Sequence, residues 1–322
     1  MHYTAAAALV LASSVAAHTR VYSAWVNGVD QGDGRDSTGY IRSPPTNDPV
    51  KDLTSTDLVC NVNGGTPVSS FVSAAAGDKV AFEWYHDSRN DDIIASSHKG
   101  PIITYIAPYT EDNGASAIWS KIDEEGYDST TGSWAVDNLI ANAGQKEFTI
   151  PSTLAAGKYL IRQEIIGLHE ADASYAENSA RGAQFYPSCL QFDITGSGSA
   201  APDENFNFNT GYTEADPGVV FNLYGSFTSY EIPGPAVWDA AGSSGGAAST
   251  IAVTSTAAST STAAVETTAA PTTIAAPTTL ATSVKASSTA VASSPAEVVS
   301  TTAAAATPTK GCSKRRNANR KF

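Results

Sequence analysis

The residues best suited to metal chemistry in this sequence are four histidines, His18, His86, His98 and His169. Residues 1–17 have the composition of an export signal, and cleavage after Ala17 would leave His18 as the first residue. An N-terminal histidine offers two nitrogen donors, its α-amino group and a ring nitrogen, which can chelate one ion. The ring of a second histidine would complete a plane of three nitrogens, which suits Cu(II) better than zinc.

Each of these histidines also has an interpretation without a metal. Cleavage could leave a histidine at the N-terminus by chance, and His86 and His98 could be ordinary residues of a strand end and a polar loop. His169 could simply pair with Glu164 or Glu170. The residue types alone therefore leave the metal site open.

Other reaction classes have weaker support. The sequence contains no Gly-x-Ser-x-Gly elbow, no His-Glu-x-x-His zinc helix and no Gly-rich phosphate loop. Residues 18–240 hold 30 acidic and 12 basic side chains. Because phosphate backbones are bound by Lys and Arg, we expect no nucleic-acid partner. Glycoside hydrolysis by paired carboxylates stays open, since acids are plentiful but none stands in an informative context.

The chain divides by composition into four parts. Residues 1–17 are an apolar leader, typical of a secretory signal peptide, and residues 18–240 form the foldable domain. Residues 241–309 consist mostly of Ala, Ser, Thr, Val, Pro and Gly, which predicts a disordered, O-glycosylated tract. Residues 310–322 form a basic tail. We expect a secreted, extracellular protein without a membrane anchor, because no other apolar run is long enough to cross a bilayer.

Export also bears on the three cysteines, because disulfides persist in oxidising compartments. Cys60 and Cys189 lie in the foldable domain, whereas Cys312 lies in the basic tail. We therefore expect a Cys60–Cys189 disulfide. In the chain-entropy account a loop of this length gives about 4 to 5 kcal/mol of stability.

Short apolar runs bounded by turn-forming residues predict a mostly-β domain. Strands are expected at residues 19–26, 57–60, 79–84, 102–107, 145–150, 157–166 and 188–195, and short helical turns near residues 133–141 and 174–179. The long segments between them lie at residues 28–56, 87–100, 113–139 and 196–217. They are rich in Gly, Asp, Asn and Pro, and loops of this length often carry function.

Four segments, in this order, resemble a known family. They are residues 18–28 (HTRVYSAWVNG), 98–101 (HKGP), 162–169 (RQEIIGLH) and 182–189 (GAQFYPSC). Together with the cysteine pair they resemble the fungal cellulose-active lytic polysaccharide monooxygenases, copper enzymes formerly classed as family sixty-one glycoside hydrolases. The resemblance extends over residues 18–238, and its specificity comes from the joint occurrence of all four motifs.

The resemblance implies roles for the matching residues at the metal. His18 would bind copper through its α-amine and its ring, which is commonly methylated in fungal relatives. His98 would be the second histidine ligand and Tyr186 the axial ligand. His169 and Gln184 would hydrogen-bond an oxygen species beside the metal and complete the catalytic set.

Further residues are implied around this centre. Arg162 and Glu164 would support the catalytic His and Gln through hydrogen bonds. Tyr212 would stack on sugar rings at a flat surface, and Tyr22 is a weaker candidate for the same role. Tyr212 could also be an ordinary loop aromatic.

The resemblance also implies a fold and an activity. The fold would be all-β, an immunoglobulin- or fibronectin-like β-sandwich with long loops, in agreement with the strand pattern. The activity would be oxidative cleavage of β-1,4-glucan chains such as cellulose at C1, C4 or both. It would be carried out by a monomer with one copper ion, an external electron donor and O2 or H2O2. The alternative is a non-catalytic copper- or polysaccharide-binding protein built on the same sandwich.

Overall fold

The computed structural model describes residues 18–240. The predicted leader (1–17), low-complexity tract (241–309) and basic tail (310–322), with Cys312, lie outside the described residues. Their assignments stay predictions.

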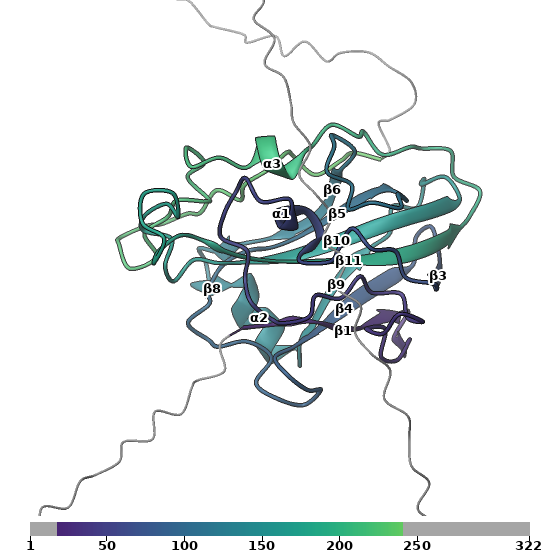
Figure 1. Ribbon diagram of the computed structural model, residues 1–322, viewed down its shortest axis with the longest axis horizontal. Coiled ribbons are helices and arrows are strands. Elements are labelled where there is room, and N and C mark those ends of the chain that lie inside the picture. Colours follow the sequence, from purple (N-terminus) through teal and green to yellow (C-terminus); the bar gives the residue numbers. More distant parts are fainter. Residues whose placement is uncertain (1–17, 241–322) are drawn as a thin grey trace, which may run out of the picture. The chain divides into compact units, whose positions relative to one another are not determined.

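Two sheets account for most of the regular structure. Their strands are β1 (Arg20–Val26), β2 (Val29–Asp30), β3 (Val72–Ala75), β4 (Lys79–Tyr85), β5 (Ile102–Pro108), β6 (Ser120–Glu125), β9 (Gln145–Thr149), β10 (Gly157–Gly167) and β11 (Gln184–Thr195). One sheet has the order β2-β1-β4-β9 and the other the order β3-β11-β10-β5-β6. Figure 1 shows the sheets face to face, which confirms the predicted β-sandwich.

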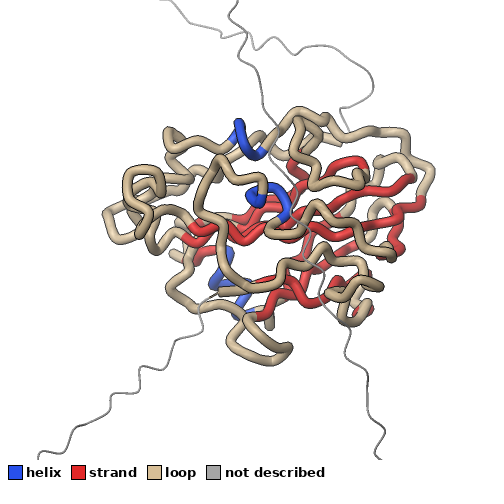
Figure 2. Tube along the Cα trace, in the orientation of Figure 1, coloured by secondary structure: helices blue, strands red, loops and turns tan. Residues whose placement is uncertain are grey.

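The remaining elements are short. They are the strand pair β7 (Tyr127–Asp128) and β8 (Ser133–Trp134) and the helices α1 (Asp57–Cys60), α2 (Ala135–Ala141) and α3 (Phe208–Gly211). Figure 2 shows how much of the domain consists of loops around the two sheets. Within residues 18–240 no helix is long and apolar enough to cross a membrane.

The three central strands of the five-stranded sheet, β5, β10 and β11, are buried on both faces over most of their length. Along β10, Ile161 and Ile165 pack into the core between the sheets, whereas Leu160 and Ile166 pack into a second apolar cluster with residues of α1 and α3. In Figure 1 these two helices lie on the outer side of this sheet. Because β10 is buried on both sides, apolar residues occur on both of its faces and it lacks a clear alternation of apolar and polar residues. Its buried polar residues Arg162, Gln163 and Glu164 all have partners.

The predicted strand at residues 57–60 is wrong, because this segment forms α1. Leu58, Val59 and Cys60 are all buried. Three consecutive residues cannot face one side in a strand, but one helical turn can direct them to the same sheet. The Arg162 guanidinium donates hydrogen bonds to the carbonyl oxygens of Leu58 and Val59, at 2.9 and 2.5 Å, and so pairs these buried backbone groups.

Other local predictions had mixed outcomes. The helical turns predicted near residues 133–141 and 174–179 are both present: the first forms α2, and the second is a single turn in which the Asn178 N–H donates to the Ser174 carbonyl at 3.0 Å. The predicted loop at residues 113–139 is wrong in part, because it contains β6, β7 and β8. The sequence of β6, SKIDEE, is polar because this strand lies at the edge of its sheet, where Lys146 binds Asp123 and Glu125 at 3.2 and 2.7 Å.

The predicted disulfide is present. Cys60 and Cys189 are bonded, with their Cα atoms 5.3 Å apart, and both are fully buried. The bond ties α1 to the middle of β11. It therefore holds the outer apolar layer against the five-stranded sheet.

Candidate metal centre

Three side chains from distant parts of the sequence converge at one end of the sandwich. His18 lies two residues before the start of β1, His98 lies in the loop before β5, and Tyr186 belongs to β11. The ring centroids are 6.2 Å apart for His18 and His98, 6.0 Å for His18 and Tyr186, and 6.1 Å for His98 and Tyr186. The structure thus brings together the three predicted metal ligands in a nearly equilateral arrangement.

The register of β10 and β11 produces part of this convergence. Gly167 pairs with Gln184 and Ile165 pairs with Tyr186, so β10 ends and β11 begins at the same end of the sheet. Ile102 at the start of β5 pairs with Ile165, which brings the loop before β5 to that end of the sheet too. The catalytic residues predicted from the motifs at 162–169 and 182–189 therefore meet the His98 loop.

His98 carries a buried nitrogen that lacks a partner. The residue is 2% exposed, and its Nδ1 lies 3.3 Å from the Ser97 hydroxyl. Its Nε2 has no hydrogen-bond partner among the described residues. Leaving a buried polar atom unpaired costs about 1 to 3 kcal/mol, so such atoms usually serve a purpose. A metal ion bound by the two imidazole rings and the Tyr186 hydroxyl would satisfy this nitrogen, and the site therefore fits a metal of the kind that histidine ligands bind.

The environment also keeps His98 in the form that binds metals. Burial lowers the pKa of His98 to about 4, and repulsion from His169 and His18 adds to the decrease. The ring is therefore predominantly neutral at near-neutral pH. Only a neutral imidazole has a lone pair for a metal. Protons therefore compete only weakly with a metal ion for His98.

Two backbone contacts lock the His98 loop to the His169 loop. The Leu168 N–H donates to the Lys99 carbonyl at 2.9 Å, and the Ile166 N–H donates to the Pro101 carbonyl at 3.1 Å. Gly100 lies between them, and a Cβ at this position would come within 1.8 Å of the Ile166 carbonyl oxygen. Only glycine permits this approach.

The start of α2 holds the same loop from another side. The Lys99 ammonium donates to both carboxylate oxygens of Asp137, at 2.8 and 2.9 Å. Asp137 also accepts from the backbone N–H of Trp134 and so caps the helix. The side chain next to His98 is thus anchored to a fixed element.

His169 lies directly against His98. Their ring centroids are 3.9 Å apart with an interplanar angle of 42°. The Nδ1 atom of His169 is buried without a hydrogen-bond partner among residues 18–240, and burial lowers the pKa of the ring. A neutral imidazole with an unpaired nitrogen is available to exchange a hydrogen bond with a small molecule bound beside it.

Tyr186 and Gln184 form a short hydrogen-bonded pair. The Tyr186 hydroxyl donates to Gln184 Oε1 at 2.6 Å, and Gln184 Nε2 donates to a carboxylate oxygen of Glu170 at 2.9 Å. Burial raises the pKa of Tyr186 well above its usual value, and the negative charges of Asp48 and Glu170 add to this effect. The phenol therefore stays protonated.

Arg162 and Glu164 do not support His169 and Gln184, and this prediction is wrong. The two side chains are fully buried and bind each other at 2.8 Å. Glu164 accepts its other hydrogen bond from Tyr212 at 2.5 Å. Because residues 162 and 164 share one face of β10, they point into the outer apolar layer.

Tyr212 is not a surface residue, so the prediction that it stacks on sugar rings is also wrong. It is 2% exposed, and its hydroxyl lies 2.6 Å from that of Tyr105 as well as bonding Glu164. Tyr22 is half-buried, and the guanidinium groups of Arg35 and Arg89 lie 4.6 and 4.7 Å from its ring centroid. Its role in stacking stays a prediction.

Tyr224 is the exposed aromatic residue that sequence reasoning missed. It is 72% exposed, the only aromatic among the strongly exposed large apolar side chains of residues 18–240. It lines a hollow with Ser97 and Lys99, the two neighbours of His98. Its position in the same long C-terminal loop as Tyr212 was the only available signal, and nothing in the sequence distinguishes which of the two is buried.

A second group of metal-ligating types lies away from this centre. His86, Asp91 and Asp92 are close enough to share an ion. However, the carboxylate of Asp91 accepts hydrogen bonds from the backbone N–H groups of His86, Asp87 and Ser88. The cluster closes a loop after β4, in keeping with the interpretation of His86 as a strand-end residue.

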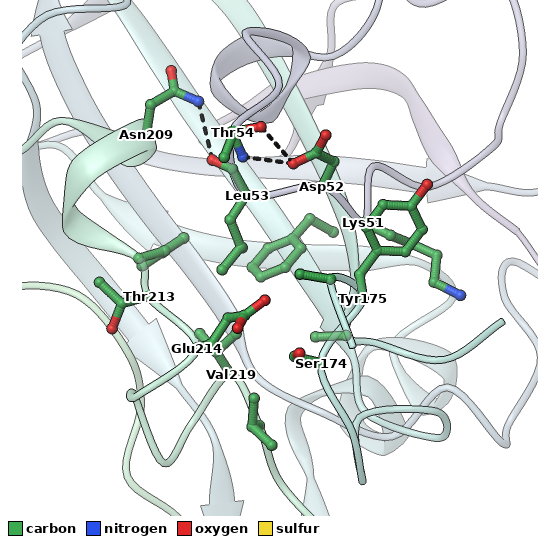
Figure 3. Close-up of a pocket in the computed structure, with 15 residues that line it drawn as sticks. Lys51, Asp52, Leu53, Thr54, Ser174, Tyr175, Asn209, Thr213, Glu214 and Val219 are labelled. Atoms are coloured by element: carbon green, nitrogen blue, oxygen red, sulfur yellow. Dashed lines mark hydrogen bonds between the residues drawn. The ribbon is translucent and has the colours of Figure 1, made fainter. Parts of the chain in front are cut away.

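A cavity of about 240 Å³ lies beside the loop that carries Glu170. Its lining includes the buried rings of Phe185 and Tyr212, together with Lys51 and Tyr175. Figure 3 shows that the Lys51 ammonium points out of this cavity. That ammonium instead reaches Glu170, at 3.2 Å.

Comparison with known proteins gives consistent matches. Residues 18–230 match the model of Auxiliary Activity family 9 (formerly GH61). The chain is 58% identical over 240 residues to the AA9 family lytic polysaccharide monooxygenase A of Collariella virescens, covering 74% of this chain and 87% of that protein. It is 52% identical over 238 residues to monooxygenase C of Aspergillus fumigatus, covering 73% of this chain but only 65% of that protein.

Two solved structures are also similar to this chain. The structure of CvAA9A matches with a TM-score of 0.68 and 59% identity, covering 69% of this chain and 99% of that one. The extended catalytic domain of H. jecorina LPMO9A matches with a TM-score of 0.59 and 31% identity, covering 69% and 91%.

Proposed function

Because the chain belongs to Auxiliary Activity family 9, a family of copper-dependent polysaccharide monooxygenases, we propose that it cleaves β-1,4-glucan chains of cellulose by oxidation. The observation that carries this proposal is the buried, unpaired Nε2 of His98, in a ring whose centroid lies 6.2 and 6.1 Å from those of His18 and Tyr186. A sandwich that only bound polysaccharide would have no need to keep this nitrogen unpaired.

The ligands of the copper ion would be His18, His98 and Tyr186. His18 would contribute its ring and, once the chain is cleaved after Ala17, its α-amino group. Bound copper would supply the redox chemistry, taking an electron from an external donor and activating O2 or H2O2 for hydrogen removal at C1 or C4 of a glucose unit. We expect a secreted monomer with one copper ion.

The surrounding residues determine how the site can act. His98 is neutral, so it binds without releasing a proton, and the protonated Tyr186 offers an oxygen lone pair rather than a full negative charge. His169 presents its unpaired Nδ1 beside His98. We expect it, together with Gln184, to orient a small oxygen species by hydrogen bonding.

Tyr224 is the best candidate for contact with the polymer. Its exposed ring stands next to the residues that flank His98. An aromatic face beside an active centre can stack on the apolar face of a pyranose ring. This contact would place a glucose unit of the chain near the metal.

The His98→Ala variant tests the proposal. Loss of one ligand should weaken copper binding by at least about tenfold, as measured by calorimetry, and abolish the release of oxidised oligosaccharides from cellulose. His86→Ala is the matched control, because it removes a histidine outside the centre and should leave both unchanged.

The products also separate the rival functions. Aldonic or ketoaldose ends indicate oxidation, and unmodified reducing ends indicate hydrolysis. The absence of any product from copper-loaded wild-type protein with ascorbate would favour a binding protein. Unchanged copper affinity in His98→Ala would refute the proposed ligand set.

A further inference from the structure

The feature of interest is an ion pair that reaches the metal centre through one amide. Glu170 Oε2 accepts hydrogen bonds from both Gln184 Nε2, at 2.9 Å, and the Lys51 ammonium, at 3.2 Å. Gln184 Oε1 in turn accepts from the Tyr186 hydroxyl at 2.6 Å. An unbroken series of hydrogen bonds thus runs from Lys51 to Tyr186.

Glu170 determines which way the Gln184 amide faces. The oxygen and nitrogen of an amide are nearly equal in shape, so the hydrogen-bonding neighbours decide the orientation. An ionised carboxylate only accepts hydrogen bonds. Gln184 must therefore present its NH2 group to Glu170 and its oxygen to Tyr186.

The amide orientation fixes the hydroxyl of Tyr186. With an acceptor beside it, the phenol donates its hydrogen to Gln184, and its oxygen lone pairs are left for the space shared with His18 and His98. A reversed amide would present N–H groups to the phenol oxygen. That oxygen would then accept, and its hydrogen would have to turn elsewhere.

The backbone holds both members of the ion pair in place. Lys51 follows Val50, which exchanges two backbone hydrogen bonds of 2.8 Å with Phe185 in β11. The Glu170 carbonyl accepts from the Gly182 N–H at 2.8 Å. Lys51 and Glu170 are thus both fixed relative to the strand that carries Gln184 and Tyr186.

We propose that Glu170, held by Lys51, is a positioning residue that sets the Gln184 amide and thereby directs the hydrogen of the Tyr186 hydroxyl away from the metal, leaving the oxygen lone pairs towards it. The proposal rests on the proposed function only in taking Tyr186 as a ligand. Glu170 acts through Gln184, and among the described residues its carboxylate bonds Lys51 and Gln184 and none of the three proposed ligands.

The test compares two charge-removing variants on the same loop. Glu170→Gln keeps the size of the side chain but can present either oxygen or NH2, so the Gln184 amide is no longer restricted to one orientation. Asp172→Asn is the matched control, because Asp172 binds Arg181 and has no contact with Gln184. Both are prepared as the full mature protein with an authentic N-terminus and loaded with Cu(II).

Electron paramagnetic resonance is the decisive measurement, because it reports the axial field and not only turnover. Glu170→Gln should give a shifted or two-component Cu(II) spectrum and lose about tenfold in the release of oxidised products, the scale typical of residues that orient metal ligands. Its copper affinity should change little, since His18 and His98 are untouched. Asp172→Asn should match the wild type in all three measurements.

Lys51→Met provides a second, independent variant. It keeps the aliphatic stem but frees the carboxylate to move, so we expect a smaller spectral change in the same direction. A wild-type spectrum in Glu170→Gln overturns the proposal, as does a wild-type spectrum in Lys51→Met if Glu170→Gln does not fold. Failure of the wild-type protein itself to bind copper would instead refute the proposed function.

Discussion

Gly100→Ala is the substitution with the most clearly calculable effect on the metal centre. The added Cβ would lie 1.8 Å from the Ile166 carbonyl oxygen, whereas an ordinary contact begins at 3.4 Å. The two backbones would have to separate by about 1.6 Å. Neither is free to move, because hydrogen bonds of 3.1 and 2.9 Å join them on either side of Gly100.

The cost follows from these contacts. Overpacking at a buried position costs about 1 to 3 kcal/mol. Loss of the two hydrogen bonds, Ile166 to Pro101 and Leu168 to Lys99, adds about 1 kcal/mol each. The total of about 3 to 5 kcal/mol corresponds to a decrease in Tm of roughly 6 to 20 °C for a domain of this size. Since the same bonds fix His98 against His169, copper affinity should also fall by at least about tenfold.

Calorimetry of the metal-free and copper-loaded variants measures both effects. Gly65→Ala is the matched control, because its Cβ would meet its nearest neighbour at an ordinary 3.7 Å and the residue does not adopt a left-handed φ. Its free energy of unfolding should change by no more than about 1 kcal/mol. A Gly100→Ala protein with wild-type Tm and copper affinity would show that the close contact does not position His98.

Three further predictions concern stability and binding. In the metal-free protein the free energy of unfolding should decrease by at most about 3 kcal/mol as pH falls from about 6.5 towards 4. The reason is that His98 is protonated in the unfolded chain over this range, whereas the folded ring, with its pKa of about 4, stays neutral. His98→Gln should show a shallower decrease in urea titrations, and an identical slope would contradict this. Replacing Cys60 and Cys189 by Ser should cost about 4 to 5 kcal/mol in the same titrations, since the bond closes a sequence separation of 129 residues; a loss below about 1 kcal/mol would count against it. Tyr212→Phe should cost about 1 to 3 kcal/mol, because Oε1 of buried Glu164 loses its donor while Oε2 keeps Arg162. It should not change adsorption to cellulose. Tyr224→Ala should leave stability unchanged and weaken adsorption about two- to tenfold, and equal adsorption by Tyr224→Ala and wild type would remove Tyr224 from the substrate surface.

Local chemistry could be predicted from the sequence because it depends on residue type and chain position. A histidine that becomes N-terminal on cleavage can chelate a metal ion whatever fold the chain adopts. The motifs around His98, His169 and Tyr186 are short stretches of sequence. The strands were also predictable where apolar runs met turn-forming residues. Predicting these features does not require knowing which residues pack against them in the folded protein.

The tertiary structure decided which polar side chains are partners. Arg162, Glu164 and Tyr212 occur within or near the motifs, but β10 is buried on both faces, so they serve the outer apolar layer instead of the metal centre. No local pattern separates buried Tyr212 from exposed Tyr224, because burial depends on how the C-terminal loop crosses the sheet. Glu170 likewise became informative only once the fold had brought it to Gln184, since a hydrogen bond between loop and strand depends on the pairing of β10 with β11.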